Sequence, residues 1–147
     1  MRSRPKGRIS IRESATIDHV YISASNPERS FEFLLAALKP LGWQEYGRFS
    51  SGGPGTAVDT WGIADNANSI WLRHSKTGAI EGIYLGIAAN STDEVDATYA
   101  AALAAGGADD GAPGPRPQFA EGYYAANFTD FDGNQFEIVN KSWAPKR

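Results

Sequence analysis

Few residue types in this 147-residue chain can carry chemistry, and this limits the reactions that the chain can support. It has no cysteine and only two histidines, His19 and His74. The absence of cysteine excludes disulfides, zinc ribbons, iron–sulfur clusters and a thiolate nucleophile. A metal must therefore be bound by these histidines, by carboxylates or by water, and a site with three histidines in one chain is impossible.

Three common functional motifs are also excluded. Residues 130–134 begin like an EF-hand loop, but the next glutamate comes too early for a twelve-residue loop and no helices flank it. The glycines at 52–55 lack the lysine and Ser/Thr of a phosphate-binding loop. No Gly-x-Ser-x-Gly elbow is present, and the two histidines do not suggest a nucleophilic triad. Residues 130–134 are interpreted as a hairpin turn.

The elements that would position reactive residues occur twice in the chain. Residues 17–24 have the alternating and β-branched pattern of a strand. Asn26 and Pro27 then begin a helix, in which apolar residues recur at i, i+3, i+4 and i+7 from Phe31. A shift of 65 residues repeats the pattern, with a strand at 82–89, a capping box and a second helix.

Three further strands are predicted in each copy, separated by turns rich in Gly, Pro, Asn and Asp. They cover 43–49, 56–63 and 69–75 in the first copy, and 107–112, 122–128 and 134–140 in the second. Each module therefore has the order βαβββ. We predict an α+β fold of two modules, 16–76 and 80–143, whose eight strands form a curled mixed sheet around a shared cleft. A ferredoxin-like domain, with a shorter repeat, is the alternative.

Charge is distributed unevenly along the chain. Residues 1–14 hold five basic residues and one acidic residue, whereas the whole chain has a net charge of −3. The acidic body argues against a nucleic-acid partner, and no apolar stretch approaches the ~20 residues of a membrane span. We expect a disordered basic tail at 1–15 and a cytoplasmic protein, with a mitochondrial transit peptide as the alternative for the tail.

Four short segments occur along the chain in an order that is typical of one protein family. They are IDHV at 17–20, AGGADDGAPGPR at 105–116, GYYAA at 122–126 and DFDGNQFE at 130–137. Together they resemble the vicinal oxygen chelate superfamily, which includes glyoxalase I, bleomycin- and fosfomycin-resistance proteins and extradiol dioxygenases. The resemblance covers about 17–141 and implies the paired βαβββ fold. It does not select a reaction, because one scaffold hosts many chemistries.

In this superfamily the first and last strands of each module surround a divalent metal, commonly with His or Glu. The resemblance places His19 and Glu137 at two of these four positions, and Tyr84 and Trp71 at the other two. Neither a phenol nor an indole is an ordinary ligand for Mg, Mn, Ni or Zn. We therefore expect either no cofactor, or a divalent Mn, Ni, Fe or Zn ion held weakly by His19 and Glu137.

Side-chain alternation along the strands extends the candidate cleft. Tyr21 and Arg73 share the inward face, His74 points away unless a bulge intervenes, and one of Tyr123 and Tyr124 faces inward. Such an aromatic cleft with a few polar groups suits a small molecule. The candidate substrate-binding residues are Tyr21, Trp71, Arg73, Tyr84, Arg116 and Tyr123.

Each candidate also has a structural alternative. His19 and Glu137 could act as a catalytic acid–base pair, since histidine titrates near neutral pH, or could be core residues. Arg73 could contact an anionic substrate or form a buried salt bridge with Glu137. Arg116, between two prolines, is expected to be a solvated loop residue, with contact to a substrate anion as the alternative. Trp71 could stack on a ligand or simply fill space.

Three functions remain open from the sequence. The first is a glyoxalase/bleomycin-resistance-like protein that binds a small aromatic or hydrophobic metabolite, with a degenerate metal site and metal-independent acid–base chemistry as an option. The second is a divalent-metal-dependent lyase, isomerase or dioxygenase that uses His19 and Glu137. The third is a non-catalytic dimeric scaffold. We expect a homodimer, because members of this superfamily often pair and a two-fold arrangement suits the shape.

Overall fold

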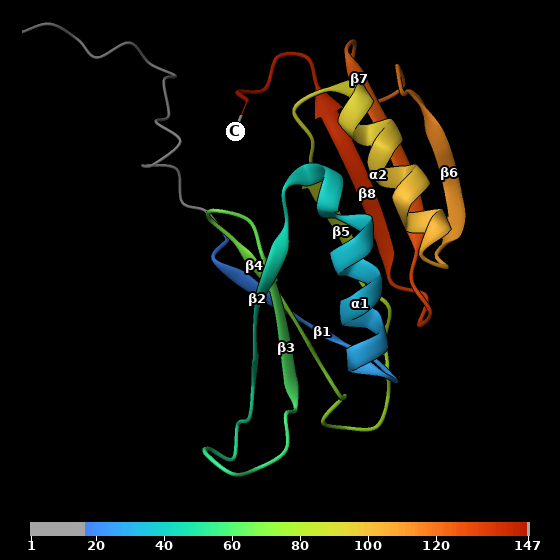
Figure 1. Cartoon of the computed structure of the whole chain (residues 1–147). Helices are drawn as coiled ribbons and strands as arrows, with labels where there is room; N and C mark the ends of the chain where they lie inside the picture. Colours follow the sequence, from blue (N-terminus) through green and yellow to red (C-terminus); the bar gives the residue numbers. More distant parts are fainter. Residues whose placement is uncertain (1–16, 147) are drawn as a thin grey trace, which may run out of the picture.

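The computed structural model describes residues 17–146, which form two βαβββ modules (Figure 1). The first module contains β1 (His19–Ser23), α1 (Pro27–Ala37), the 3-10 helix η1 (Lys39–Leu41), β2 (Gln44–Phe49), β3 (Thr60–Ala64) and β4 (Ser69–Arg73). The second contains β5 (Tyr84–Ala88), α2 (Thr92–Ala104), β6 (Ala108–Pro115), β7 (Tyr123–Thr129) and β8 (Gln135–Lys141). The predicted element types and their order are confirmed. The basic segment expected at 1–15 lies outside the described residues.

The strands form two four-stranded mixed sheets with the same topology. Their orders are β1-β4-β3-β2 and β5-β8-β7-β6, and in each sheet the first and last strands of the module pair in parallel. The other pairs are antiparallel. Three strands follow each helix, which excludes the shorter ferredoxin-like repeat. The curl of all eight strands around one cleft stays a prediction.

Both helices begin at the predicted caps. The Asn26 side chain accepts a hydrogen bond from the Arg29 amide at 3.1 Å, and Pro27 occupies the first turn. The Ser91 hydroxyl accepts from the Glu94 amide at 3.1 Å, while the Glu94 carboxylate accepts from the amide of Asn90 at 2.6 Å. The Ser91 bond is the first half of the predicted capping box and satisfies an amide that the helix leaves unpaired, whereas the Glu94 carboxylate reaches the amide one residue before the cap.

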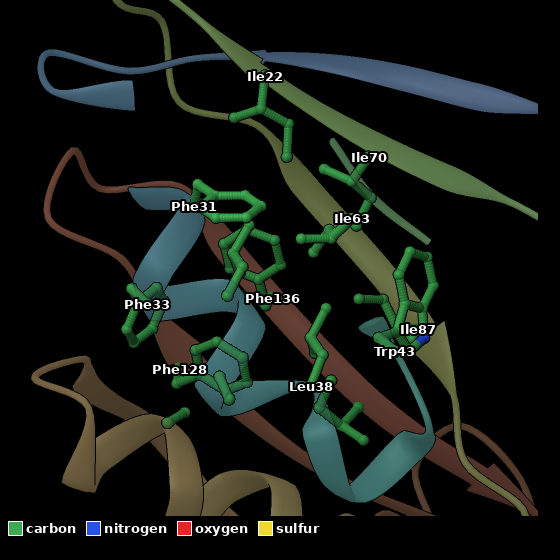
Figure 2. Close-up of a cluster of buried hydrophobic side chains, with 14 of the residues drawn as sticks. Ile22, Phe31, Phe33, Leu38, Trp43, Ile63, Ile70, Ile87, Phe128 and Phe136 are labelled. Atoms are coloured by element: carbon green, nitrogen blue, oxygen red, sulfur yellow. The ribbon is translucent and has the colours of Figure 1, made fainter. Parts of the chain in front are cut away.

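The two modules share one hydrophobic core. Figure 1 shows α1 between the two sheets, and α1 also packs against α2. Phe33 of α1 meets the edge of Phe128 of β7 with ring centroids 5.9 Å apart, and Phe128 stacks on Phe136 of β8 at 5.4 Å (Figure 2). Each sheet therefore has an inner face buried against the helices and an open face turned away from them.

Additional contacts join the start of α1 to the turn before β8. The Ser25 amide donates to the carboxylate of Asp132 at 3.1 Å, and the guanidinium of Arg29 lies 3.6 Å from the ring centroid of Phe131. These contacts help to fix the relative position of the modules.

Between residues 17 and 146, no helix is both long and apolar enough to cross a membrane.

Candidate functional site

Four aromatic side chains gather on the open face of the first sheet. Tyr21 of β1 stacks on Trp71 of β4 with ring centroids 6.4 Å apart. Tyr46 and Phe49, both of β2, lie 5.2 and 5.4 Å from the ring of Trp71. We call this set (Tyr21, Tyr46, Phe49 and Trp71) the aromatic face. Because Ile22, Ile70 and Leu72 are buried on the inner face, the predicted alternation of β1 and β4 is confirmed.

Trp71 is held at the centre of this face by its neighbours. Gly62 of β3 is its register partner, and a Cβ atom placed at Gly62 would lie only 2.5 Å from Cζ3 of the indole. The ring thus rests directly on the backbone of β3, where any side chain would displace it. The indole Nε1–H donates to the hydroxyl of Ser69 at 3.0 Å.

A bulge in β2 brings Tyr46 and Phe49 to the same ring. In a regular strand, residues three apart point to opposite faces. The register with β3 shifts between Glu45 and Gly47, which inserts one residue and restores the two rings to a common face. Simple alternation assigns Tyr46 and Phe49 to opposite faces, so it cannot group them. The sequence analysis named neither of them as a site residue.

Polar groups lie at the two ends of the aromatic face. His19 and Ser69 form one register pair, and Ser23 and Arg73 form another at the far end of the same strands. The guanidinium of Arg73 lies 4.4 Å from the ring centroid of Tyr21. At the other end, His19 contacts the edge of Tyr21 at 5.8 Å between centroids.

His19 is neither buried nor isolated. Its side chain is 49% exposed, and its Nδ1 lies 2.8 Å from the carboxylate of Asp18. It lines a cavity of about 650 Å³ between the modules, which also has Val20, Ile70 and Leu85 in its wall. His74 is exposed and does not line this cavity.

The open face of the second sheet carries a hydrogen-bonded carboxylate. Tyr84 donates its hydroxyl to one oxygen of Glu137 at 2.9 Å, and Tyr123 donates to the other at 2.5 Å. Asn127 donates its amide to the hydroxyl of Tyr84 at 2.9 Å and accepts from Arg116 at 2.7 Å. Arg116 lies 3.9 Å from the first Glu137 oxygen, which closes the ring. We call these five residues the carboxylate network.

Two expectations about the arginines are corrected by this network. Glu137 pairs with Arg116 and not with Arg73, because Arg73 lies on the other sheet. Arg116 is not a solvated loop residue, since its side chain is only 19% exposed and it also donates to the carbonyl of Ala125 at 3.3 Å. The cause is that β6 runs on to Pro115, beyond the predicted end at 112. An edge strand tolerates proline, and the continued pairing with β7 carries Arg116 inward.

Burial and the neighbouring carboxylate raise the pKa values of both phenols. Burial, followed by the hydrogen bond to Glu137, raises the pKa of Tyr123 to about 12. The pKa of Tyr84 is also raised, chiefly by burial. At neutral pH the two hydroxyls are therefore donors, and they satisfy both oxygens of the carboxylate.

The two tyrosines of β7 point to opposite faces, as predicted. Tyr123 reaches Glu137 on the open face, whereas Tyr124 donates its hydroxyl to Asp96 of α2 at 2.7 Å. Sequence reasoning missed Asn127. This residue follows Tyr123 by four positions on β7, so both side chains lie on the same face of the strand. Alternation along β7 would have found it.

The donor set does not fit the divalent metal that the superfamily resemblance implies. Both Glu137 oxygens accept phenol hydrogen bonds, and Trp71 and Tyr84 occupy the remaining two positions. His19 lies on the other sheet and lines a different cavity from Glu137. In the part of the chain that the structure describes, no three His, Cys, Asp or Glu side chains are grouped to hold a metal. We derive no chemical step through a metal.

Comparison with known proteins identifies the family. The family model "Glyoxalase/Bleomycin resistance protein/Dioxygenase superfamily" matches residues 16–138, and the chain belongs to this superfamily. The predicted resemblance is thereby confirmed. None of the curated proteins compared with the chain matches it significantly.

Solved structures agree with this assignment. A glyoxalase/bleomycin resistance protein from Albidiferax ferrireducens T118 is 28% identical, with a TM-score of 0.65 over 84% of this chain and 96% of that one. A superfamily member from Sphaerobacter thermophilus DSM 20745 is 21% identical, with a TM-score of 0.61 over 85% and 96%. A family enzyme from Burkholderia phytofirmans PsJN is 20% identical, with a TM-score of 0.64 over 84% and 97%. The latter two show the shared fold alone.

Proposed function

We propose that this protein binds a small planar aromatic metabolite on the aromatic face and needs no resident metal to do so. The observation that carries the proposal is the exposure of the aromatic face. Tyr21, Tyr46 and Phe49 are 46%, 61% and 50% exposed around the half-buried ring of Trp71. Exposed apolar clusters of this kind are typical of ligand or partner surfaces, because water is a poor solvent for them. Membership of a superfamily with small-molecule-binding members supports this choice.

The carboxylate network supplies a second, polar surface. The hydroxyls of Tyr84 and Tyr123, held by Glu137, give a rigid surface that could orient polar groups of a ligand. Tyr84 is 58% exposed and is therefore accessible to a molecule placed against this sheet.

We also propose that the two surfaces meet in a homodimer. Within one chain they lie on the open faces of different sheets, on either side of the common core. Among the strands that the structure describes, β1 and β5 each pair on one side only, which leaves the other side for further pairing. In a two-fold dimer, the aromatic face of one copy would cover the carboxylate network of the other. Sedimentation velocity tests this, and a monomer at micromolar concentration would contradict it.

Binding of a neutral aromatic probe tests the main proposal. We expect 2-naphthamide to bind in isothermal titration calorimetry, and Trp71→Leu to weaken binding about tenfold, which corresponds to ~1.4 kcal/mol of lost stacking and burial. Trp143→Phe is the matched control, because Trp143 is 56% exposed and lies outside β1–β8. Equal affinities of Trp71→Leu and the unmodified protein would overturn the proposal. So would the absence of binding by 2-naphthamide and its carboxylate analogue.

A further inference from the structure

We propose that the metabolite bound by the aromatic face is an aromatic anion, whose negative group pairs with Arg73; this rests on the proposed function. The starting observation is the environment of Arg73. Its guanidinium lies over the ring of Tyr21, and no carboxylate in the described part of the chain forms an ion pair with it. The cation is therefore held at the rim of an aromatic surface without an anionic partner.

Two other arginines of the chain show what a structural role looks like. Arg48 contacts three glutamates at 3.0 to 3.5 Å, and its side chain is part of a surface ion-pair cluster. Arg116 is hydrogen bonded to Asn127 and Ala125 and lies beside Glu137. In both cases neighbouring oxygen atoms accept hydrogen bonds from the guanidinium. Arg73 differs because no acceptor between residues 17 and 146 takes a hydrogen bond from its guanidinium, so its N–H donors can serve a ligand.

The strand register fixes where the Arg73 backbone lies relative to the rings, and the side chain reaches back from there to place the guanidinium 4.4 Å from the Tyr21 ring centroid. Tyr21 pairs with Trp71 at the centre, while Ser23 pairs with Arg73 two residues further along the same strands. At about 3.3 Å per residue, the Arg73 pair lies roughly 7 Å beyond the central pair. A ligand of two fused rings that stacks on Tyr21 and Trp71 would place an attached carboxylate close to Arg73.

The other end of the face has the opposite character. The Nδ1 atom of His19 is hydrogen bonded to the carboxylate of Asp18, so this end of the face combines an imidazole with a carboxylate. An anionic group would be repelled there and attracted at the Arg73 end, which orients the molecule along the strands. A neutral or cationic ligand that covered the face would remove water from Arg73 and leave its charge unpaired, which is unfavourable. A carboxylate can instead accept two parallel hydrogen bonds from the guanidinium.

A pair of probes that differ only in charge tests the inference. 2-Naphthoate and 2-naphthamide have the same ring system, and calorimetry gives the dissociation constant of each. We expect the carboxylate to bind at least tenfold more tightly at low salt, and this preference to shrink as sodium chloride is added. Arg73→Gln should remove the preference, because it weakens binding of the carboxylate and removes the unpaired charge that disfavours 2-naphthamide. Arg29→Gln is the matched control, because Arg29 also lies over an aromatic ring, but on α1 against Phe131 and not on the aromatic face.

The outcomes separate this inference from the proposed function. If both probes bind equally, or if Arg73→Gln keeps the preference, the anion inference is overturned while aromatic binding stands. Tighter binding of 2-naphthylmethylammonium than of 2-naphthoate also overturns it. If neither naphthalene probe binds, both proposals fail. A partial preference in Arg73→Lys would support the inference, because lysine keeps the charge and loses the planar fork.

Discussion

The indole of Trp71 rests on Gly62 so closely that a Cβ atom at position 62 would come within 2.5 Å of the ring. Gly62→Ala should therefore push the indole off β3 and disorganise the aromatic face. We expect a loss of ~1 to 3 kcal/mol in the free energy of unfolding, the usual range for overpacking, and weaker binding of naphthalene probes. Chemical denaturation and calorimetry measure the two effects.

Gly86→Ala is the matched control for this substitution. Gly86 also lies on a strand, its backbone is not left-handed, and a Cβ atom there would meet no heavy atom within 4 Å. It should unfold like the unmodified protein. If Gly62→Ala is as stable as Gly86→Ala and keeps its affinity, the close packing of Trp71 on β3 is not what positions the ring.

The ionisation of Tyr123 offers a test of the carboxylate network. Burial and Glu137 raise its pKa to about 12. Glu137→Gln removes the negative charge and replaces the acceptor with a neutral amide, so the pKa of Tyr123 should fall towards its ordinary value of about 10. Absorbance at 295 nm during an alkaline titration follows this change in the pKa of Tyr123. An unchanged titration curve in Glu137→Gln would contradict the hydrogen bond.

The same raised pKa makes a prediction about stability at high pH. A phenol whose pKa is higher in the folded chain stabilises that state fully below the unfolded pKa, near pH 10. This contribution disappears as the pH rises from about 10 to about 12. Tyr123→Phe should therefore show a smaller loss of unfolding free energy over this interval, measured by urea denaturation. A parallel decline in the two proteins would contradict the prediction.

Arg116 and Arg73 have different surroundings and should respond differently to mutation. Arg116 donates to Asn127 and Ala125 inside the network, so Arg116→Gln leaves buried acceptors without partners. We expect a loss of ~1 to 3 kcal/mol in unfolding free energy. Arg73→Gln removes only a contact with the half-exposed ring of Tyr21 and should cost less than ~1 kcal/mol. Thermal denaturation compares the two, and the reverse order would contradict these assignments.

The sequence predicted the fold well because its signals are local and occur twice. Helix caps such as Asn26 and Ser91 depend on neighbouring residues, and the alternation in β1 and β4 follows from strand geometry. The shared face of Tyr21, Trp71 and Arg73 was predictable for the same reason. The 65-residue repeat then supplied the topology without any long-range information.

The parts that sequence reasoning missed depend on interruptions of that regularity or on contacts between distant residues. The bulge near Gly47 changes the face of Phe49, and no residue type announces it. Arg116 was misplaced because its two neighbouring prolines suggested a loop, whereas the edge position of β6 tolerates them. Alternation therefore offered only Arg73 as a partner for Glu137, whereas the structure pairs Glu137 with Arg116.

The hydrogen bonds to both oxygens of Glu137 should prevent this carboxylate from binding a divalent metal. A metal bound only by the folded protein raises its stability by about 2.7 kcal/mol when its concentration is a hundredfold above the dissociation constant. Both Glu137 oxygens are occupied by the hydroxyls of Tyr84 and Tyr123, so coordination would first have to break these hydrogen bonds. We expect no rise in Tm with about 1 mM Mn²⁺, Ni²⁺ or Zn²⁺ relative to EDTA. A rise that Glu137→Gln abolished would show that a metal competes successfully with the tyrosines, and would restore metal-dependent chemistry as the leading function.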